Sequence, residues 1–500
     1  MTGHRSRAAN VHSPRSRVSV SRGMGETGLM GSTAGAEPVP AGSEKLATQV
    51  ARQLEDEIID RTWPVGEVLG SELELQERFG VSRSVLREAI RLLEHHHVAR
   101  MRSGRGGGLV VCAPNPSSGI RAMVIYLEYI GISVGDLLRA RLLLEPLAAR
   151  LAAEAVTEDG IDRMRAILGQ EQIGDPDRFS DNEFHVALGR LSGNPVLPLF
   201  TEVLTQLTYR YSRHPPRDAA AAALPDVTAA HAKILDAVTA GDAAAAQTRM
   251  ATHLAEVEAW FLVHRMHGPS QQMRTRPDDP KPDELPGRKL GEIIAGRIHD
   301  DITGDGRQIG EVLGSESELL TRYGISRAVL REAIRILEHH NVAQMRRGPR
   351  GGLVILAPDP TASIHTIALY LDHQGVRYDH LHMVRETIEL GCIQTVTTAP
   401  ATPGTAARFR AARDHATDSG ELFHAELAEL AGNPVLTLFL RIITDLWARH
   451  SRTERAPAPA AETEVRRVHD TILDAVMAGD EGLAQHRMRR HLQTLTTWWH

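Results

Sequence analysis

The sequence predicts a mainly α-helical protein built from two copies of one module. Each copy has a small domain of helices with a short β-hairpin, followed by an all-α helical bundle. Three observations predict this fold class: apolar residues recur at helical spacing along most of the chain, a 31-residue segment occurs twice, and a proline-containing stretch divides each copy. Because only 4% of the residues are aromatic, the cores depend on Ala, Leu, Ile and Val, which favours helices.

The composition excludes several classes of protein. Two cysteines cannot form the framework of a disulfide-rich secreted domain, and they are not paired in a zinc-binding motif. Apolar runs fall short of the roughly 18 residues that a membrane span needs, and the N-terminus lacks the apolar core of a secretory signal. A net charge of −6 gives no overall footprint for nucleic acid, so any such footprint must be local. We therefore expect a cytoplasmic protein without a membrane partner.

The duplication sets the expected domain boundaries. Residues 69–99 and 313–343 are identical at 23 of 31 positions, at an offset of 244 that becomes 239 and then 238 further along. Proline-rich residues 268–287 are typical of a linker between domains. We predict a disordered tail (1–43), two N-terminal domains (44–114 and 288–358), two helical bundles (115–267 and 359–500) and the linker (268–287).

Each N-terminal domain has the pattern of a winged helix-turn-helix. Ser71 and Glu74 fit a capping box, which predicts a helix over 72–79 that ends at Gly80. Ser82 is placed to cap the next helix, and two helices joined by a short glycine-containing turn are typical of helix-turn-helix domains. Two short β segments around a glycine-rich tip then predict a wing, with Arg105 at the tip.

Positive charge is concentrated in the same segments. Residues 78–105 hold seven arginines against two glutamates, a net charge of +5, and residues 322–350 repeat this balance. A run of charge is usually a solvated helix face. Here, however, the arginines lie on the second helix of the motif and at the wing, and they recur in both copies. This arrangement favours neutralisation of DNA phosphates.

Both segments resemble the winged helix-turn-helix of GntR-family bacterial regulators, through Gly80-Val81-Ser82-Arg83 and the Val-Leu-Arg-Glu-Ala that follows. The resemblance implies contacts with double-stranded DNA from the second helix, and Arg can bind the O6 and N7 atoms of guanine. We therefore expect Arg83 and Arg327 to read bases, while Arg87, Arg331 and the wing arginines hold phosphates. The predicted DNA-binding residues are Ser82, Arg83, Arg87 and Arg105, and Ser326, Arg327, Arg331 and Arg350.

The bundle of the first module contains one aspartate and three histidines in helical, apolar surroundings: Asp181, His185, His231 and His253. A lone histidine on an apolar face is more often a hydrogen-bonded core residue than a metal ligand. Four such residues around one bundle, three of which recur in the second copy, favour a divalent metal instead. Zinc is the first choice, with nickel or manganese as alternatives.

The bundles resemble the FCD effector domain of the FadR subfamily, which implies a metal beside a small organic-acid effector. The second module keeps His424, His469 and His491, but Gly420 replaces the aspartate, so we expect its metal site to be weakened or absent. Arg141 and Arg385 are candidates for binding the effector carboxylate. Each could equally pair with the glutamate four residues later, Glu145 or Glu389.

Together these features predict a transcriptional regulator rather than an enzyme. We expect the two modules to pair within one chain, as an internal dimer that binds a palindromic operator, and two chains could pair again. The resemblance implies repression that an effector relieves. A metal-dependent hydrolase would leave both winged domains unexplained and has no evident general base. A non-specific architectural DNA binder would show little sequence preference and no response to a ligand.

Overall fold

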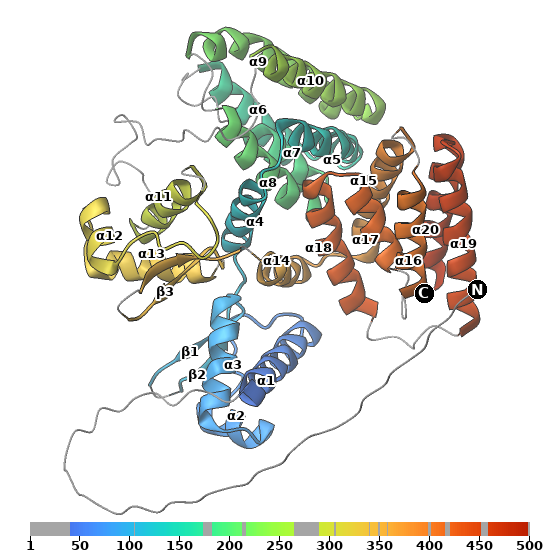
Figure 1. Ribbon diagram of the computed structural model, residues 1–500. Coiled ribbons are helices and arrows are strands. Elements are labelled where there is room, and N and C mark those ends of the chain that lie inside the picture. Colours follow the sequence, from blue (N-terminus) through green and yellow to red (C-terminus); the bar gives the residue numbers. More distant parts are fainter. Residues whose placement is uncertain are drawn as a thin grey trace, which may run out of the picture.

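The computed structural model describes residues 41–104, 106–173, 183–212, 217–264, 290–304, 307–339, 341–348, 351–357, 359–398, 402–415, 421–451 and 459–498. They form four units in chain order, which we call winged domain 1 (41–111), bundle 1 (117–263), winged domain 2 (290–355) and bundle 2 (361–498) (Figure 1). Among the described residues, the named strands form only two short hairpins, one in each winged domain. The predicted fold class is confirmed.

Winged domain 1 follows the local signals of its sequence. Ser71 and Glu74 form a reciprocal capping box, and Gly80 ends the helix with φ of 61° in the left-handed region, where glycine is favoured. Ser82 caps the next helix by accepting a hydrogen bond from the backbone N–H of Val85. Its elements are α1 (Ala41–Asp60), α2 (Glu72–Phe79), α3 (Arg83–His95), β1 (Ala99–Arg102) and β2 (Gly108–Val111).

Winged domain 2 repeats this construction. Ser315 and Glu318 form the same capping box, and Gly324 ends the helix with φ of 62°. Its antiparallel hairpin pairs Ala343 with Ile355, as the hairpin of winged domain 1 pairs Ala99 with Val111. Its elements are α11 (Leu290–Gly304), α12 (Glu316–Tyr323), α13 (Arg327–His339), β3 (Ala343–Arg346) and β4 (Gly352–Ile355).

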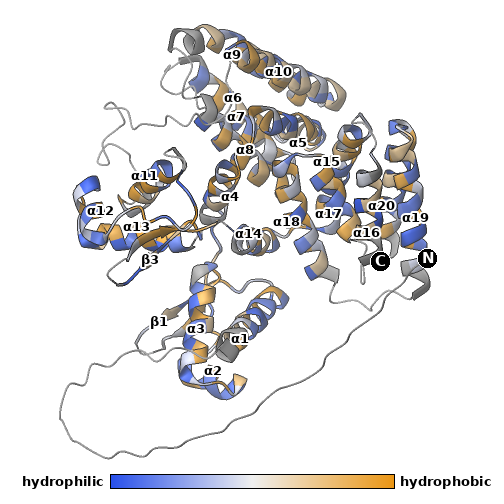
Figure 2. Cartoon of the chain, viewed as in Figure 1, coloured by the Kyte–Doolittle hydropathy of each residue, from blue (hydrophilic) through white to orange (hydrophobic). Residues whose placement is uncertain are grey.

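The two bundles are built from homologous helices whose apolar faces turn inward (Figure 2). Bundle 1 contains α4 (Ser117–Tyr129), α5 (Val134–Glu154), α6 (Glu158–Ile173), α7 (Glu183–Leu191), α8 (Val196–Ser212), α9 (Arg217–Thr239) and α10 (Ala243–Val263). Bundle 2 contains α14 (Thr361–His373), α15 (Tyr378–Thr398), α16 (Pro403–His415), α17 (Glu421–Leu430), α18 (Pro434–Ser451), α19 (Pro459–Met477) and α20 (Glu481–Trp498).

The bundles share one continuous hydrophobic core, to which α4, α5 and α8 contribute from one side and α14, α15 and α18 from the other. Asn194 and Asn433, in the two Gly-Asn-Pro turns, add matching hydrogen bonds across the junction. The Asn194 side-chain N–H donates to the His380 carbonyl at 3.0 Å, and that of Asn433 donates to the Asp136 carbonyl at 2.9 Å. The two modules are therefore packed against each other through equivalent surfaces.

Each winged domain also packs against the bundle of the other module. Leu369 of α14, in bundle 2, belongs to the hydrophobic core of winged domain 1, and the equivalent Ile125 of α4, in bundle 1, belongs to that of winged domain 2. The same crossing is visible in Figure 1, where α14 lies next to winged domain 1 and α4 next to winged domain 2. A change in either bundle therefore has a direct physical route to the opposite winged domain.

Candidate DNA interface and histidine clusters

The second helix of the helix-turn-helix in winged domain 1, α3, carries two of the predicted DNA-binding arginines on an exposed face. Arg83 and Arg87 have side chains that are 65% and 54% exposed. Both point their Nε atoms at Glu72 of α2, at 3.0 and 2.8 Å. Among the described residues, the structure gives their terminal guanidinium nitrogens no protein partner. Glu72 thus orients two guanidiniums while leaving their outer edges for another acceptor.

Glu72 was not among the residues singled out from the sequence. Hydrogen bonds from Arg83 and Arg87 lower the pKa of its carboxyl, because they stabilise the charged form. Its position, one residue after the capping serine, was a signal for helix initiation only. That the same side chain reaches the next helix depends on how α2 and α3 cross.

Winged domain 2 presents the equivalent residues differently. Ser326 accepts a hydrogen bond from the Val329 backbone N–H, and Arg327 and Arg331 are exposed. Within the described part of the chain, no ion pair joins them to Glu316, the counterpart of Glu72. The predicted wing-tip arginines, Arg105 and Arg350, lie outside the described residues. The strands beside the tips still carry exposed Arg100, Arg102 and Arg346.

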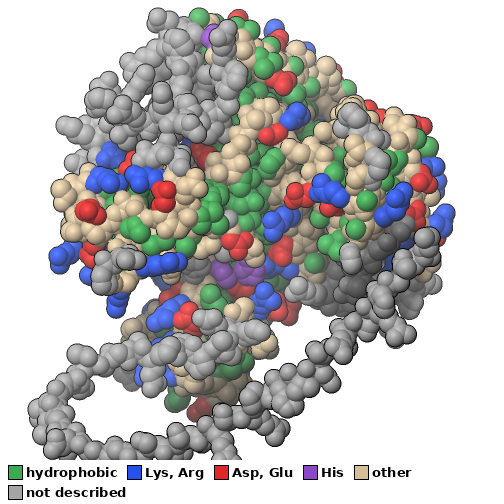
Figure 3. All heavy atoms as spheres, in the orientation of Figure 1, with side chains coloured by type: hydrophobic (Ala, Val, Ile, Leu, Met, Phe, Trp, Pro, Cys, Tyr) green, Lys and Arg blue, Asp and Glu red, His purple; other side chains and the backbone are tan. Residues whose placement is uncertain are grey.

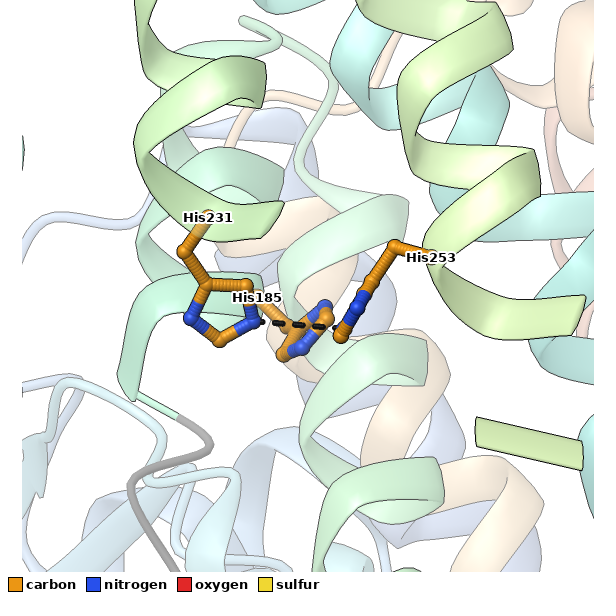
Figure 4. Close-up of side chains that lie close together, drawn as sticks. All are labelled: His185, His231 and His253. Atoms are coloured by element: carbon orange, nitrogen blue, oxygen red, sulfur yellow. Dashed lines mark hydrogen bonds between the residues drawn. The ribbon is translucent and has the colours of Figure 1, made fainter. Parts of the chain in front are cut away.

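In bundle 1 the three predicted histidines converge from three helices. His185 of α7, His231 of α9 and His253 of α10 are 5%, 3% and 3% exposed, and one ring nitrogen of each lies within 4.8 Å of the others. The Nε2 atoms of His231 and His253 face each other at 3.3 Å (Figure 4). The fourth predicted ligand, Asp181, lies outside the described residues.

Bundle 2 gathers its three histidines in the same way. The Nε2 atom of His491 of α20 lies 3.0 Å from that of His469 of α19 and 3.3 Å from that of His424 of α17. All three residues are at most 5% exposed. Gly420, at the position of the aspartate, lies outside the described residues. The second cluster is thus as compact as the first in its imidazoles.

Carboxylates behind the histidines determine where their protons lie. The Nδ1 atom of His185 lies 2.7 Å from Glu145, that of His231 lies 2.8 Å from Glu171, and that of His424 contacts Glu389. The hydrogen bonds of His231 and His424 hold the proton on Nδ1 and leave the Nε2 lone pair facing the centre of the cluster. Two Nε2 atoms that face each other, such as those of His231 and His253 at 3.3 Å, either share a proton in a hydrogen bond or bind a cation between them. This donor arrangement therefore fits a divalent metal ion.

The titration of these groups agrees with that interpretation. Burial lowers the pKa of His231 to about 3 and that of His253 to about 2, so both imidazoles are neutral, the form that binds metals. Burial alone would raise the pKa of Glu145, but the charges of Arg141 and His185 outweigh it and lower the pKa to about 2. Glu145 is thus an anion behind the histidine, as metal sites commonly have.

The two predicted effector-binding arginines form buried ion pairs. Arg141 donates from Nε to Glu145 at 2.6 Å and contacts Thr208 at 3.2 Å, and Arg385 donates to Glu389 at 2.6 Å. Of the two alternatives that the sequence left open, the structure therefore contains the pairing with the glutamate four residues later. Each glutamate also reaches a histidine of the cluster, so arginine, glutamate and imidazole form one connected chain in each bundle.

Comparison with known proteins identifies both parts of the module. The profile of the FCD domain matches residues 136–256 and 380–494, and that of bacterial regulatory proteins of the gntR family matches residues 46–108 and 290–353. LutR of Bacillus subtilis, an HTH-type transcriptional regulator, is 32% identical over 200 residues, which cover 39% of this chain and 90% of LutR. The Escherichia coli transcriptional repressor NanR is 25% identical over 250 residues, covering 46% of this chain and 89% of NanR.

Two further similarities are partial. The Uxu operon regulator of Haemophilus influenzae is 33% identical over 172 residues, or 33% of this chain, and the match spans 60% of that relative's length. The solved structure of Streptococcus agalactiae GntR is 27% identical, covers 43% of this chain and 99% of its own, and gives a TM-score of 0.31.

The winged domains, the histidine-lined bundles, the two profile matches and the named regulators define a DNA-binding transcriptional regulator with effector domains, rather than an enzyme. The chain belongs to the GntR family of bacterial regulatory proteins, and it contains both the GntR and the FCD domain twice. None of the helices that the structure describes is long and apolar enough to cross a membrane.

Proposed function

We propose that this regulator is a cytoplasmic repressor of the FadR subfamily that binds a palindromic operator through both winged domains of one chain. The observation that carries the proposal is the near identity of α3 and α13, which differ only at positions 84 and 92 against 328 and 336. Two such helices should read nearly identical half-sites. The relative NanR is a transcriptional repressor, which supports repression as the direction of regulation.

The paired modules would replace the two subunits of an ordinary dimeric regulator. Dimeric helix-turn-helix proteins match their symmetry to that of the operator. Here the shared core and the reciprocal hydrogen bonds of Asn194 and Asn433 support pairing within the chain. A further pairing of two chains would give four winged domains, and it is not required for recognition of a single palindrome.

The effector would be a small organic acid that binds in the bundles beside a divalent metal. In bundle 1, Asp181, His185, His231 and His253 would hold the metal, with zinc as first choice and nickel or manganese as alternatives. In bundle 2, His424, His469 and His491 would hold it more weakly, because Gly420 supplies no anionic ligand. A metal ion bound by neutral imidazoles attracts a carboxylate, which accounts for the class of effector.

Binding of that carboxylate by Arg141 or Arg385 would require an exchange of partners. Both guanidiniums are buried and paired with Glu145 and Glu389, which contact the cluster histidines. An effector carboxylate that displaced either glutamate would disturb the connected chain of arginine, glutamate and histidine. The effector would then bind the two states of the bundle with different affinities. Such a difference is what allows a ligand to change the affinity for DNA.

The signal would then cross between modules. In bundle 1, Arg210 of α8 contacts Glu128 of α4 and bonds Asp300 of winged domain 2 at 2.6 Å. In bundle 2, Arg449 of α18 contacts His365 of α14, which bonds Glu55 of winged domain 1 at 2.9 Å. The state of each bundle would therefore set the placement of the opposite winged domain.

The test is selection of bound sequences from a random duplex library by the purified full-length chain. We expect enrichment of a palindrome whose half-sites are centred about one helical turn apart. Enrichment should be lost in the double variant Arg83→Ala/Arg327→Ala and kept in the matched control Arg91→Ala/Arg335→Ala, which removes exposed arginines from the same helices. Lack of enrichment by folded wild-type protein at moderate salt would overturn the proposal.

A further inference from the structure

A third cluster of metal-binding side chains lies outside both bundle sites, where winged domain 1 meets bundle 2. Glu55 of α1 accepts hydrogen bonds from His96, just after α3, at 2.7 Å and from His365 of α14 at 2.9 Å. One ligand atom of each residue lies within 4.8 Å of the other two. Figure 3 shows histidine side chains gathered at the junction between this domain and the bundles.

We propose that Glu55, His96 and His365 form a binding site for a divalent cation of the zinc class, which joins winged domain 1 to bundle 2. A carboxylate and two imidazoles are a ligand set that zinc accepts, with water in the fourth position. The ligands come from three helices of two units that are far apart in the chain. A cation here would therefore hold the winged domain against the bundle.

The surroundings suit a cation. The Glu55 side chain is 2% exposed, whereas those of His96 and His365 are 13% and 22% exposed, so the site is shielded but open to an ion and a water molecule. Burial would raise the pKa of Glu55, but hydrogen bonds from His365 and His96 outweigh it and lower the pKa to about 2. The carboxylate is therefore an anion at neutral pH.

Arg449 is the competitor of the cation. Its guanidinium contacts the Nδ1 atom of His365, which then accepts a hydrogen bond and leaves the proton on the Nε2 atom that faces Glu55. A metal bound at Nε2 requires the proton on Nδ1 instead, so Arg449 would release His365. Arg449 keeps a partner in that state, since its Nε atom bonds Asp445 at 2.9 Å. That pairing also offsets the positive charge of Arg449 beside the ion.

The equivalent junction in the other half of the molecule cannot bind the ion in this way. His299 stands at the position of Glu55, and Arg121 at that of His365. The contact between winged domain 2 and bundle 1 is made instead by Arg210 with Glu128 and Asp300. This ligand set therefore occurs at one of the two junctions. A substitution of His299, the counterpart of Glu55, serves as the control for substitutions at the proposed site.

The experiment counts bound zinc by elemental analysis of the full-length chain, after chelator treatment, zinc addition and desalting. In a background of His231→Gln, His253→Gln, His469→Gln and His491→Gln, we expect about one zinc ion per chain to remain. Glu55→Gln or His365→Gln should remove it, and the control His299→Gln should not. Arg449→Ala should tighten zinc binding several-fold, because it removes the competitor for His365.

Either of two results would overturn the proposal: a folded background variant that retains no zinc, or an unchanged zinc content after His365→Gln. The cluster would then be only a hydrogen-bonded contact. If the background variant does not fold, the wild-type chain decides, because Glu55→Gln must lower its zinc content by about one ion per chain. The measurement requires no DNA and no effector, so its failure is distinguishable from failure of the proposed regulation.

Discussion

Phe200 and Phe439 stack face to face at the junction of the two modules, with ring centroids 3.9 Å apart and planes inclined by 10°. They occupy equivalent positions of the duplicated sequence, at the offset of 239. In a symmetric homodimer, a residue on the two-fold axis meets its own copy. Here one chain supplies both members of the pair, and both rings are fully buried in the core that the two modules share.

The base-reading arginines, Arg83 and Arg327, and the phosphate-binding Arg87 should affect DNA binding in different ways. Arg83→Ala or Arg327→Ala should each reduce discrimination at one half-site by about 1–3 kcal/mol, because a bidentate contact with guanine is lost. Arg87→Ala should instead weaken binding to all sequences and flatten the salt dependence, since it removes a phosphate contact. Competition titrations on the selected operator and on single-base variants of it would measure both. Equal losses on every sequence would contradict base reading by Arg83.

Glu72 should matter for specificity in winged domain 1 alone. Glu72→Gln removes the carboxylate that orients Arg83 and Arg87, and with it one negative charge. We expect affinity for random DNA to rise while the ratio of specific to random binding falls. Glu316→Gln in winged domain 2 makes the same change of charge, but the structure gives Arg327 and Arg331 no such pairing with it. The same loss of specificity in both variants would contradict a positioning role.

Local signals account for what the sequence predicted well. Ser71, Glu74 and Gly80 determine where α2 begins and ends, because each acts on its own backbone neighbours. The convergence of His185, His231 and His253 also followed from the sequence, although their roles as ligands stay predictions. Their spacing placed them on helix faces, and the duplicate repeated them.

Long-range contacts account for what the sequence did not predict. Glu171 was overlooked because nothing near it in sequence indicates that it contacts His231, 60 residues away. The contact of Glu55 with His365 joins residues 310 positions apart. It exists only because α14 packs against the opposite winged domain, and no periodicity within either segment encodes that crossing.

The buried pair of Arg385 and Glu389 makes a sharp stability prediction. Glu389→Gln removes the carboxylate that pairs with the fully buried Arg385 and should lower the free energy of unfolding by about 3–5 kcal/mol. Glu386 lies on the same helix as Glu389, and Glu386→Gln, which breaks a partly exposed pair with Arg489 of α20, should cost less than about 1 kcal/mol. Urea unfolding of both variants would measure the difference. Similar small losses would mean that Arg385 finds another anion.

Acid should destabilise the bundles through the same carboxylates. The pKa values of Glu145 and Glu389 fall from 4.5 to about 2 because the charges of their arginine and histidine partners outweigh burial. A carboxyl with a lowered folded-state pKa contributes its stability above the unfolded value and loses it as pH falls. We expect the melting temperature to drop between pH 4.5 and 2, and the drop to shrink in Glu389→Gln. An identical pH profile in that variant would contradict this origin.

Metal removal should affect the two bundles unequally. A ligand that binds only the folded state stabilises it by RT ln(1 + [L]/Kd), about 4 kcal/mol at a thousandfold excess over Kd. If the aspartate strengthens the first site, His231→Gln should abolish most of the zinc-dependent rise in melting temperature, and His469→Gln much less. Bundle 2 still places the Nε2 atoms of His469 and His491 3.0 Å apart, so some stabilisation by zinc should survive in His231→Gln. Differential scanning calorimetry with zinc and with chelator would compare the zinc-dependent rise in melting temperature of the two variants. A larger effect of His469→Gln would mean that packing of the imidazoles, rather than the fourth anionic ligand, determines metal affinity here.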